Sequence, residues 1–227
     1  MLGTSRAIAD ELMDDPAVDP RSLSENFDDI ERANRLFGGL APVLHAVFAA
    51  DARTVLDVGC GSGDVARAIA RAARARGRQV EVTCLDRSPA VLAIARERTR
   101  SEPSIRVVEG DALALPFGDA SFDVATLNLA LHHFDELEAV AGLRELRRVA
   151  RTQPFVCDLR RSPPAYYAAI AYATLIARNP LTRHDAPLSV RRAYTPEEAL
   201  GLALRAGWKA PRVRRSPFFR MLVWDDA

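Results

Sequence analysis

Short hydrophobic runs alternate with amphipathic segments through the middle of the chain. The runs with strand character span residues 54–58, 80–85, 105–108, 122–127 and 155–159. Between them, apolar residues recur at helical spacing over 65–76, about 89–100 and 135–149. Strands that alternate with helices are typical of a parallel sheet with helices on both faces. The pattern therefore predicts an α/β core over residues 51–160.

The segment before this core is expected to form an N-terminal helical cap over residues 1–50. Its apolar residues recur at helical spacing, and Ser22 with Glu25 suggests a capping box at the start of the first helix. The glycine pair 38–39 ends this helix, and a second helix is expected over 41–50.

The segment after the fifth strand is expected to form a helical lid over residues 161–194. A helix over 163–177 is followed there by a polar loop. Residues 195–227 are expected to add a closing helix and an antiparallel strand pair. The whole prediction is a single domain, residues 1–227, with a doubly wound, mostly parallel seven-stranded sheet.

Three glycines, Gly59, Gly61 and Gly63, follow the first expected strand and lead directly into a helix. Glycine here lets a backbone press against a ligand, although glycines also cluster in plain tight turns. Asp64 stands where the dinucleotide-binding fingerprint would have its third glycine, so that fingerprint is incomplete. Asp86 ends the second strand, where a carboxylate can bind ribose hydroxyls. The two features favour a nucleoside-type ligand.

Polar residues stand at the end of every expected parallel strand. They are Asp57, Asp86 with Arg87, Glu109 with Asp111, Asn128 with His132 and His133, and Asp158 with Arg160. Ligands of open α/β sheets bind outside the carboxyl ends of the strands. We therefore expect one continuous site there, although Asp111 taken alone could be a turn or capping residue.

The charge and composition of the chain give no indication of a nucleic-acid or membrane partner. The formal net charge is +1, and no basic stripe with interleaved aromatic residues points to nucleic acid. The acidic run 10–31 and the basic run 205–220 are interpreted as solvated faces or as surfaces that attract each other. The uncharged stretch 162–177 is too short to cross a membrane, and no signal peptide is evident.

The three cysteines, Cys60, Cys84 and Cys157, fit no metal-binding spacing. We interpret them as small core residues in a reducing compartment, and a cytoplasmic location is expected. Carboxylates such as Asp158 and Asp185 lack companion ligands at an informative spacing, so no metal site is expected.

The ordered motifs resemble those of class I S-adenosylmethionine-dependent methyltransferases of the small-molecule branch. The four matching stretches are Val55–Gly63, Leu85–Pro89, Gly110–Phe117 and Ser121–Phe134, within about residues 53–160. The flanks are similar to bacterial methyltransferases of aromatic polyketide or quinone-type substrates. The resemblance implies a Rossmann-like methyltransferase fold, with S-adenosyl-L-methionine as cofactor and S-adenosyl-L-homocysteine as product.

The resemblance also implies roles for individual residues. The implied cofactor-binding residues are Asp57, Gly59, Cys60, Gly61, Gly63, Asp86, Arg87, Asp111, Ala112, Asn128 and Leu129. The glycine loop would take the methionine part of the cofactor and Asp57 would orient its amino group. Asp86 would bind the ribose, Asp111 the adenine amine, and Asn128 with Leu129 would line the wall near the sulfonium.

A histidine base suits the deprotonation of a phenol near neutral pH. His132 and His133 follow the fourth strand beside the expected methyl donor. His184 with Asp185 is a possible pair of base and orienting acid on the loop after the lid helix. Each of the three could instead be a packing or solvated residue, and His45 is expected to be structural.

The acceptor pocket is expected between the N-terminal helices, the lid and the loop after the fourth strand. Tyr166 and Tyr167, with Tyr172, offer amphipathic aromatic surface for a flat apolar substrate, although they could equally be core or dimer contacts.

The expected function is transfer of a methyl group to a phenolic or polyketide-like hydroxyl of a small molecule. C-methylation of a quinol-type ring is an alternative, as are a nicotinamide-dependent oxidoreductase and a cofactor-binding module without turnover. Asp64 and the absence of a Tyr-x-x-x-Lys pair argue against the oxidoreductase. We expect a small-molecule acceptor, no nucleic-acid or membrane partner, and a monomer or homodimer.

Overall fold

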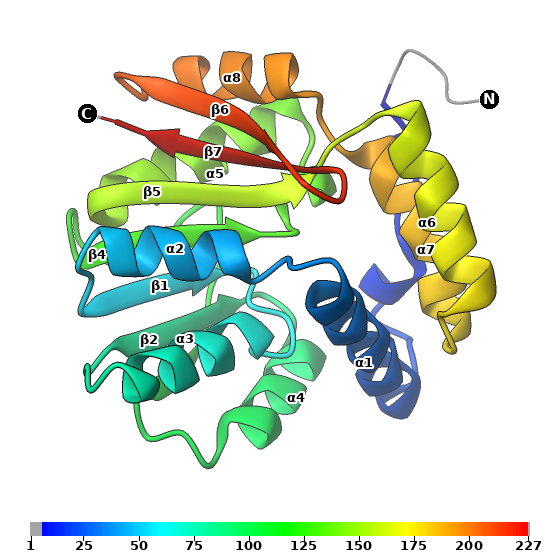
Figure 1. Cartoon of the computed structure of the whole chain (residues 1–227), viewed down its shortest axis with the longest axis horizontal. Helices are drawn as coiled ribbons and strands as arrows, with labels where there is room; N and C mark the ends of the chain where they lie inside the picture. Colours follow the sequence, from blue (N-terminus) through cyan, green and yellow to red (C-terminus); the bar gives the residue numbers. More distant parts are fainter. Residues whose placement is uncertain (1–5, 227) are drawn as a thin grey trace.

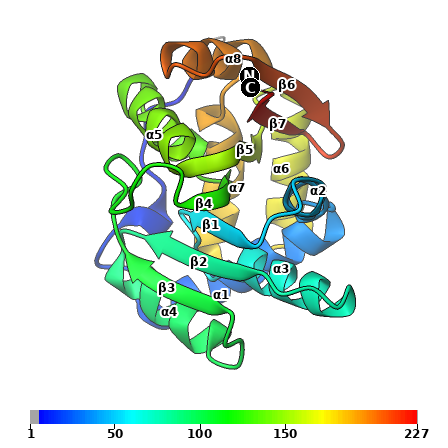
Figure 2. The same ribbon diagram turned by 90° about the vertical axis from the view of Figure 1, so that its left-hand side faces the viewer.

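A seven-stranded sheet runs through residues 6–226, the part of the chain that the computed structural model describes. The strand order is β3-β2-β1-β4-β5-β7-β6, and helices lie on both sides of the sheet (Figures 1 and 2). The first five strands pair in parallel, whereas β7 pairs antiparallel with both β5 and β6. The predicted doubly wound, mostly parallel seven-stranded α/β fold is confirmed.

The strands are β1 (Thr54–Val58), β2 (Glu81–Asp86), β3 (Ile105–Glu109), β4 (Phe122–Asn128), β5 (Ala150–Leu159), β6 (Pro211–Ser216) and β7 (Arg220–Asp225). The helices are α1 (Pro20–Leu36), α2 (Ala41–Ala49), α3 (Asp64–Ala75), α4 (Pro89–Thr99), α5 (Glu136–Val149), α6 (Pro163–Leu175), α7 (Pro180–Arg192) and α8 (Pro196–Arg205). Two short 3₁₀ helices, η1 (Leu12–Asp14) and η2 (Leu131–His133), precede α1 and α5. The elements of the core agree with the sequence pattern, except that β5 starts five residues earlier than predicted.

The side chains of the central strand β1 face two separate hydrophobic cores. Leu56 belongs to a core shared with α5 and α8, whereas Val55 belongs to one shared with α2, α3 and α4. Both side chains are fully buried, which explains the nearly continuous apolar run in this strand. The strand order reverses between β1 and β4, so their carboxyl ends form the crevice where such sheets bind ligands.

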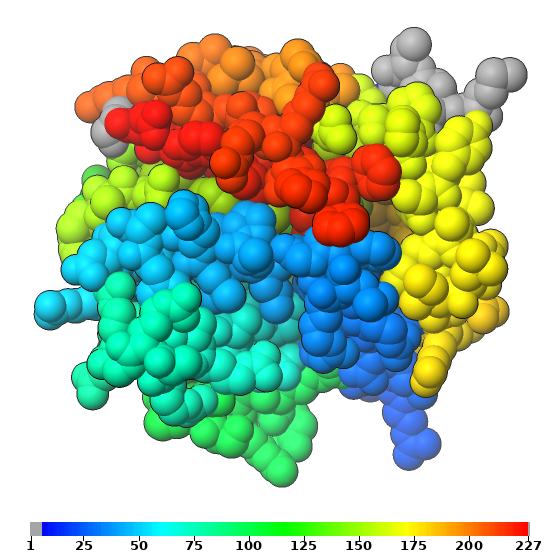
Figure 3. Space-filling view, viewed as in Figure 1, coloured from blue at the N-terminus to red at the C-terminus, as the bar shows by residue number. Residues whose placement is uncertain are grey.

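Three helices, α1, α6 and α7, lie together beyond the carboxyl end of β5 (Figure 1). Asp29 on α1 connects them: its carboxylate accepts from the backbone N–H groups of Arg178 and Asn179 at 2.7 and 2.8 Å. Its carbonyl accepts from the Tyr172 hydroxyl on α6 at 2.6 Å. On the outside of the molecule the surfaces of α1 and α6 adjoin (Figure 3).

Two predictions in the flanks are wrong. The first helix is capped by Asp19, whose side chain accepts from the Ser22 N–H at 2.9 Å, so Ser22 lies inside the helix. Pro20 explains this start, because proline is favoured at the first helical position.

The predicted polar loop after α6 is the helix α7, which begins after Asn179 and contains Pro187. Some of its polar residues mislead the sequence pattern because they face α1 and η1 instead of water. The Thr182 hydroxyl donates to Asn26, and the Asp185 carboxylate accepts from the backbone of η1. Both side chains are buried.

Candidate active site

The glycine loop after β1 adopts a backbone that favours glycine at all three positions. Gly59, Gly61 and Gly63 have φ angles of 64°, 52° and 74°, in the left-handed region that side chains disfavour. A Cβ on Gly61 would lie 3.0 Å from the Phe27 ring of α1, and one on Gly63 would lie 2.9 Å from Thr99. The loop therefore has no room for larger residues and presents bare backbone to the crevice.

Asp57, at the end of β1, is a buried acid with unused hydrogen-bonding capacity. It is 1% exposed, and its Oδ1 accepts from the Thr126 hydroxyl at 3.0 Å and from the Asn128 amide at 3.2 Å. Its Oδ2 and the Asn128 Oδ1 have no hydrogen-bond partner among residues 6–226. Burial, with the charges of Asp64 and Asp86 nearby, raises the pKa of Asp57 to about 7.

Two buried acceptors without donors are costly in a folded protein, and they suit a ligand that brings donors with it. The amino group of S-adenosylmethionine is cationic and carries N–H donors. The chemistry of this end of β1 therefore fits the cofactor that the sequence motifs imply.

Asp86, at the end of β2, holds the glycine loop in place. Its carboxylate accepts from the backbone N–H of Gly61 at 3.3 Å and of Ser88 at 3.1 Å. Burial raises the pKa of this carboxyl above its usual value. Arg87 beside it is exposed. Asp86 thus lies next to the glycine loop, and its binding to a ribose stays a prediction.

The remaining predicted cofactor residues lie on the neighbouring turns. Asp111 is exposed and accepts from the Leu113 N–H at 2.9 Å, so it shapes a turn in this structure. Ala112 is half-buried beside it. Leu129 has a φ of 49° although it is not glycine, a strained backbone of the kind that clusters at ligand sites. Cys60 is buried within the glycine loop.

The helix α1 is fixed over the loop through Glu31, a residue that the sequence analysis did not single out. The Glu31 Oε1 accepts from the Ser62 hydroxyl at 2.8 Å and from Arg67 and Arg98 at 2.6 and 2.7 Å. Burial by itself would raise the pKa of Glu31, but these donors lower it. Asn34 of α1 also donates to Asp64 at 2.8 Å. The cap thus forms one wall of the crevice.

The segment that leads into the two histidines after β4 lies beside the glycine loop. A Cβ on Gly59 would approach the Cβ of Ala130, the residue before η2, to 2.9 Å. His132 is 3% exposed, and its Nδ1 lies 2.7 Å from the Asp158 carboxylate at the end of β5. Burial by itself would raise the pKa of Asp158, but the contact with His132 lowers it.

His133 and His184 also contact carboxylates. The Nδ1 of His133 lies 2.9 Å from Asp14, and the pKa of His133 is raised: burial would lower it, but Asp14 and Glu11 outweigh burial. The Nδ1 of His184 lies 2.8 Å from Asp185. The side chain of His184 is 52% exposed, against 21% for His133.

Residues 11–14 connect all three histidines. Glu11 lies 3.6 Å from the Nε2 of His132 and 3.8 Å from that of His133. Asp185, the partner of His184, accepts from the backbone N–H groups of Leu12 and Met13 at 2.9 and 3.0 Å. Nothing in the local spacing indicates Glu11 or Asp14, because they reach the histidines from more than a hundred residues away in sequence.

The predicted acceptor-pocket tyrosines lie on α6. Tyr167 is 60% exposed and Tyr166 is half-buried, with their rings 5.7 Å apart. Tyr172 is buried, and its hydroxyl is used in the contact with α1. His45, expected to be structural, is exposed on α2.

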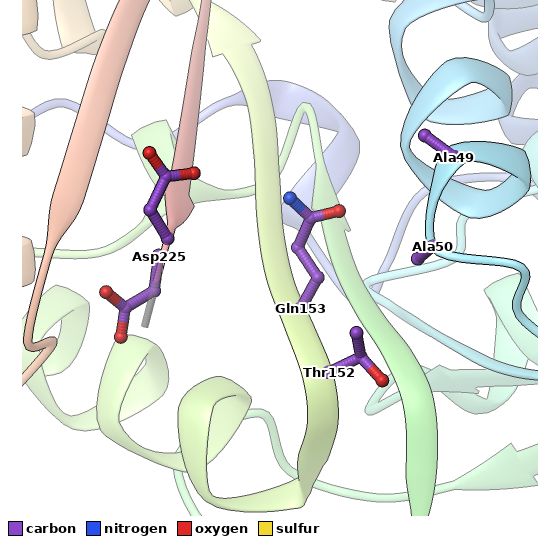
Figure 4. A pocket seen from close by; sticks show the side chains of 6 residues that line it. Ala49, Ala50, Thr152, Gln153 and Asp225 are labelled. Carbon is purple, nitrogen blue, oxygen red and sulfur yellow. The ribbon is translucent and has the colours of Figure 1, made fainter.

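Two open hollows lie at the opposite end of the sheet. One, of about 290 Å³, is lined by Asp51, Arg53, Arg78 and Gln79. The other, of about 390 Å³, is lined by Ala49, Ala50, Thr152, Gln153, Asp225 and Asp226 (Figure 4). Their linings precede β1 and β2 or belong to the start of β5 and the end of β7, so neither hollow includes a predicted site residue.

Residues 55–153 match the family model of the methyltransferase domain. The chain is 37% identical over 109 residues to a demethylmenaquinone methyltransferase of Staphylococcus aureus (strain MRSA252), a match that covers 48% of this chain and 43% of that protein. The chain therefore spans less than half the length of this relative.

Solved structures with the same fold cover nearly the whole chain. A candidate O-methyltransferase of Nostoc punctiforme PCC 73102 superposes with a TM-score of 0.68 at 17% identity, over 97% of this chain and 64% of that one. A SAM-dependent methyltransferase of Aquifex aeolicus superposes with a TM-score of 0.64 at 20% identity, over 91% and 97%.

The resemblance stated above is confirmed by these matches. The part of the chain that carries the motifs matches a methyltransferase-domain model, and the fold is shared with solved S-adenosylmethionine-dependent methyltransferases. Within residues 6–226, no helix combines the length and the apolar character that a membrane crossing requires.

Proposed function

We propose that the protein transfers a methyl group from S-adenosyl-L-methionine to a hydroxyl of a small aromatic or polyketide-like acceptor. The observation that carries this proposal is the close approach of the glycine loop to the segment that holds His132 and His133. Gly59 could not take a Cβ without meeting Ala130, which directly precedes η2. A methyl donor in the loop would therefore lie next to two histidines that carboxylates hold in place.

The cofactor would be held by residues at four neighbouring strand ends. They are Asp57, Gly59, Cys60, Gly61 and Gly63 after β1, Asp86 and Arg87 after β2, Asp111 and Ala112 after β3, and Asn128 and Leu129 after β4. The unpaired Oδ2 of Asp57 and Oδ1 of Asn128 support this placement, because both are acceptors without donors. When bound, the cofactor supplies a methyl group that its sulfonium already activates.

The protein's own residues would then orient the acceptor, exclude water and accept a proton. We place the base among His132, His133 and His184. His133 is the more accessible of the two in η2, and its contact with Asp14 directs Nε2 away from that carboxylate. Removal of the phenol proton leaves an oxyanion as the nucleophile, and the imidazole keeps the proton. The acceptor pocket would lie between α1, η2 and the α6–α7 pair, with Tyr166 and Tyr167 at its rim.

C-methylation of a quinol-type ring is the second candidate. It is favoured by the similarity to the Staphylococcus aureus relative, whose name gives demethylmenaquinone as its substrate. The same base could serve, because deprotonation of a quinol hydroxyl makes the ring carbons nucleophilic. A cofactor-binding module without turnover is the candidate that remains if no acceptor reacts.

Two measurements test the proposal. Calorimetric titration should show one S-adenosylmethionine per chain in the wild type and weaker binding in Asp86→Ala, while binding of a nicotinamide dinucleotide instead would refute the cofactor assignment. A panel of phenols and quinols with a ¹³C-methyl donor should then yield a labelled product, whose methyl chemical shift distinguishes an O-methyl from a C-methyl group. A protein that binds the cofactor tightly but labels none of the panel would support the binding module.

A further inference from the structure

Three side chains outside the cofactor site direct ligand atoms at one point, where the Glu11 Oε1 also accepts from the Ser189 hydroxyl at 2.8 Å. They are Glu11, which precedes η1, and His132 and His133 of η2. One ligand atom of each lies within 4.8 Å of the other two. Glu11 and His132 are each 3% exposed, whereas His133 is half-buried and leaves one side open.

The hydrogen bonds of the two histidines fix which nitrogen carries a proton. The Nδ1 of His132 lies 2.7 Å from Asp158, and the Nδ1 of His133 lies 2.9 Å from Asp14. A carboxylate accepts, so each Nδ1 donates, and a neutral imidazole then has its lone pair on Nε2. Histidines that bind metals almost always donate their other ring nitrogen to a carboxylate or carbonyl in this way.

The distances between the three groups leave a gap that suits an ion. The Nε2 atoms of His132 and His133 lie 3.6 and 3.8 Å from the Glu11 carboxylate. These separations are too long for hydrogen bonds. Atoms that share a metal ion at about 2.0–2.2 Å from each can be this far apart.

The charges around this point also favour a cation. Three carboxylates, those of Glu11, Asp14 and Asp158, face the histidine pair. Two cations lie close by and spend donors on backbone carbonyls: Arg192 donates to those of His132 and His133 at 3.3 and 2.9 Å, and Arg6 donates to that of His132 at 3.0 Å. The net charge of this cluster is therefore negative unless a cation binds or the histidines take up protons.

We propose that Glu11, His132 and His133 bind one divalent transition-metal ion of the zinc class. Two imidazole nitrogens and one carboxylate oxygen are a ligand set for zinc and neighbouring first-row ions, and magnesium disfavours imidazole. Three protein ligands leave a coordination position open toward His133. The expectation of no metal rested on local spacing, which could not bring in Glu11 from 121 residues away.

The proposed metal site rests on the geometry of its three ligands and does not depend on the proposed function. It would, however, change the proposed role of the histidines as a base. With the ion bound, the two imidazoles hold the metal instead of accepting a proton. A hydroxyl that occupies the open position would lose its proton to water at a lower pH than when free, because the ion stabilises the oxyanion.

The test is a calorimetric titration of the full, tag-free, chelator-treated chain with Zn²⁺, and separately with Mg²⁺. The wild type should bind one Zn²⁺ per chain and Mg²⁺ far more weakly. Glu11→Gln and His133→Gln should each weaken Zn²⁺ binding at least about tenfold. His45→Gln, which removes an exposed histidine outside the cluster, should bind as the wild type does.

A second readout uses Co²⁺, whose visible absorption reports its ligands. The Co²⁺ spectrum of the wild type should be lost in His133→Gln, a half-buried position where glutamine can be accommodated if Glu11→Gln fails to fold. No Zn²⁺ binding by the wild type, or equal binding in both cluster variants, would overturn the proposal in favour of protonated histidines. Cofactor binding is titrated separately, so failure of the metal site and failure of the proposed function are distinguishable.

Discussion

Replacing Asp57, the buried acid of β1 just before the glycine loop, should stabilise the protein while it weakens cofactor binding. The pKa of Asp57 is about 7 in the folded chain, against about 3.9 in an unfolded one. The folded state therefore binds more protons between these values, and its stability falls as the pH rises from about 4 to about 7. Above pH 7 the penalty is complete, and a difference of about three pH units corresponds to about 4 kcal/mol.

Asp57→Asn removes this penalty and keeps the shape of the side chain. Its Oδ1 can still accept from Thr126 and Asn128, as the acid does. In urea unfolding without cofactor, the variant should be more stable than the wild type by about 4 kcal/mol at pH 8 and by about 1.5 kcal/mol at pH 5. Calorimetry should show that its affinity for S-adenosylmethionine is about tenfold lower or worse, because a charged acceptor is lost.

Asp123 offers a control of opposite sign. Its carboxylate accepts from the backbone of Arg53 and Thr54; burial by itself would raise its pKa, but these donors lower it. Asp123→Asn should therefore lose stability at pH 8, and the loss should vanish as the pH falls through the lowered pKa. The reasoning fails if Asp57→Asn is no more stable than the wild type at pH 8, or if its gain is the same at both pH values.

Three further predictions concern the loop, the cap and the thiols. Gly63→Ala should lower stability by about 2 kcal/mol and weaken cofactor binding in calorimetry, whereas Gly77→Ala, also at positive φ but with open space around it, should cost about 1 kcal/mol and leave binding unchanged. Glu31→Gln should cost about 2 kcal/mol in urea unfolding and speed hydrogen exchange in α1; unchanged exchange there would contradict the role of Glu31. Burial raises the pKa of the Cys157 thiol, and contact with Cys84 together with burial raises that of Cys60. Ellman's reagent should therefore label no thiol of the folded chain at pH 8 and three after denaturation, and fast native labelling would refute their burial.

The sequence could predict the core of the fold because its signals are local. The run Val55–Val58 is apolar apart from Asp57 since β1 is buried on both faces, and the glycines that follow are required by their φ angles. The same local signals located Asp57 and Asp86 at the crevice. Such features depend on neighbours within a few residues, so periodicity and spacing reveal them.

The flanks could not be predicted equally well because their contacts are distant in sequence. The helix α7 has polar residues that α1 and η1 satisfy, so its pattern lacks a clear apolar face. Glu31 is an ordinary acid on a helix until Arg67 and Arg98 of other helices surround it. The role of Glu11 likewise cannot be read from its sequence neighbours, because its contact with His132 forms only in the folded chain. A single sequence does not show which distant residues a polar side chain contacts in the folded protein.

The position of β7 between β5 and β6 has a consequence for biosynthesis. Arg220 at the start of β7 donates to Asn34 of the cap at 2.7 Å, and Asn34 in turn donates to Asp64 behind the glycine loop. During translation the loop and the cap leave the ribosome long before residue 220 does. Until β7 emerges, the nascent chain therefore lacks the pairing of β7 with β5 and the hydrogen bond from Arg220 to the cap. Ribosome-bound chains that stop before β7 are expected to show the edge of β5 and the cap as exposed, protease-sensitive features.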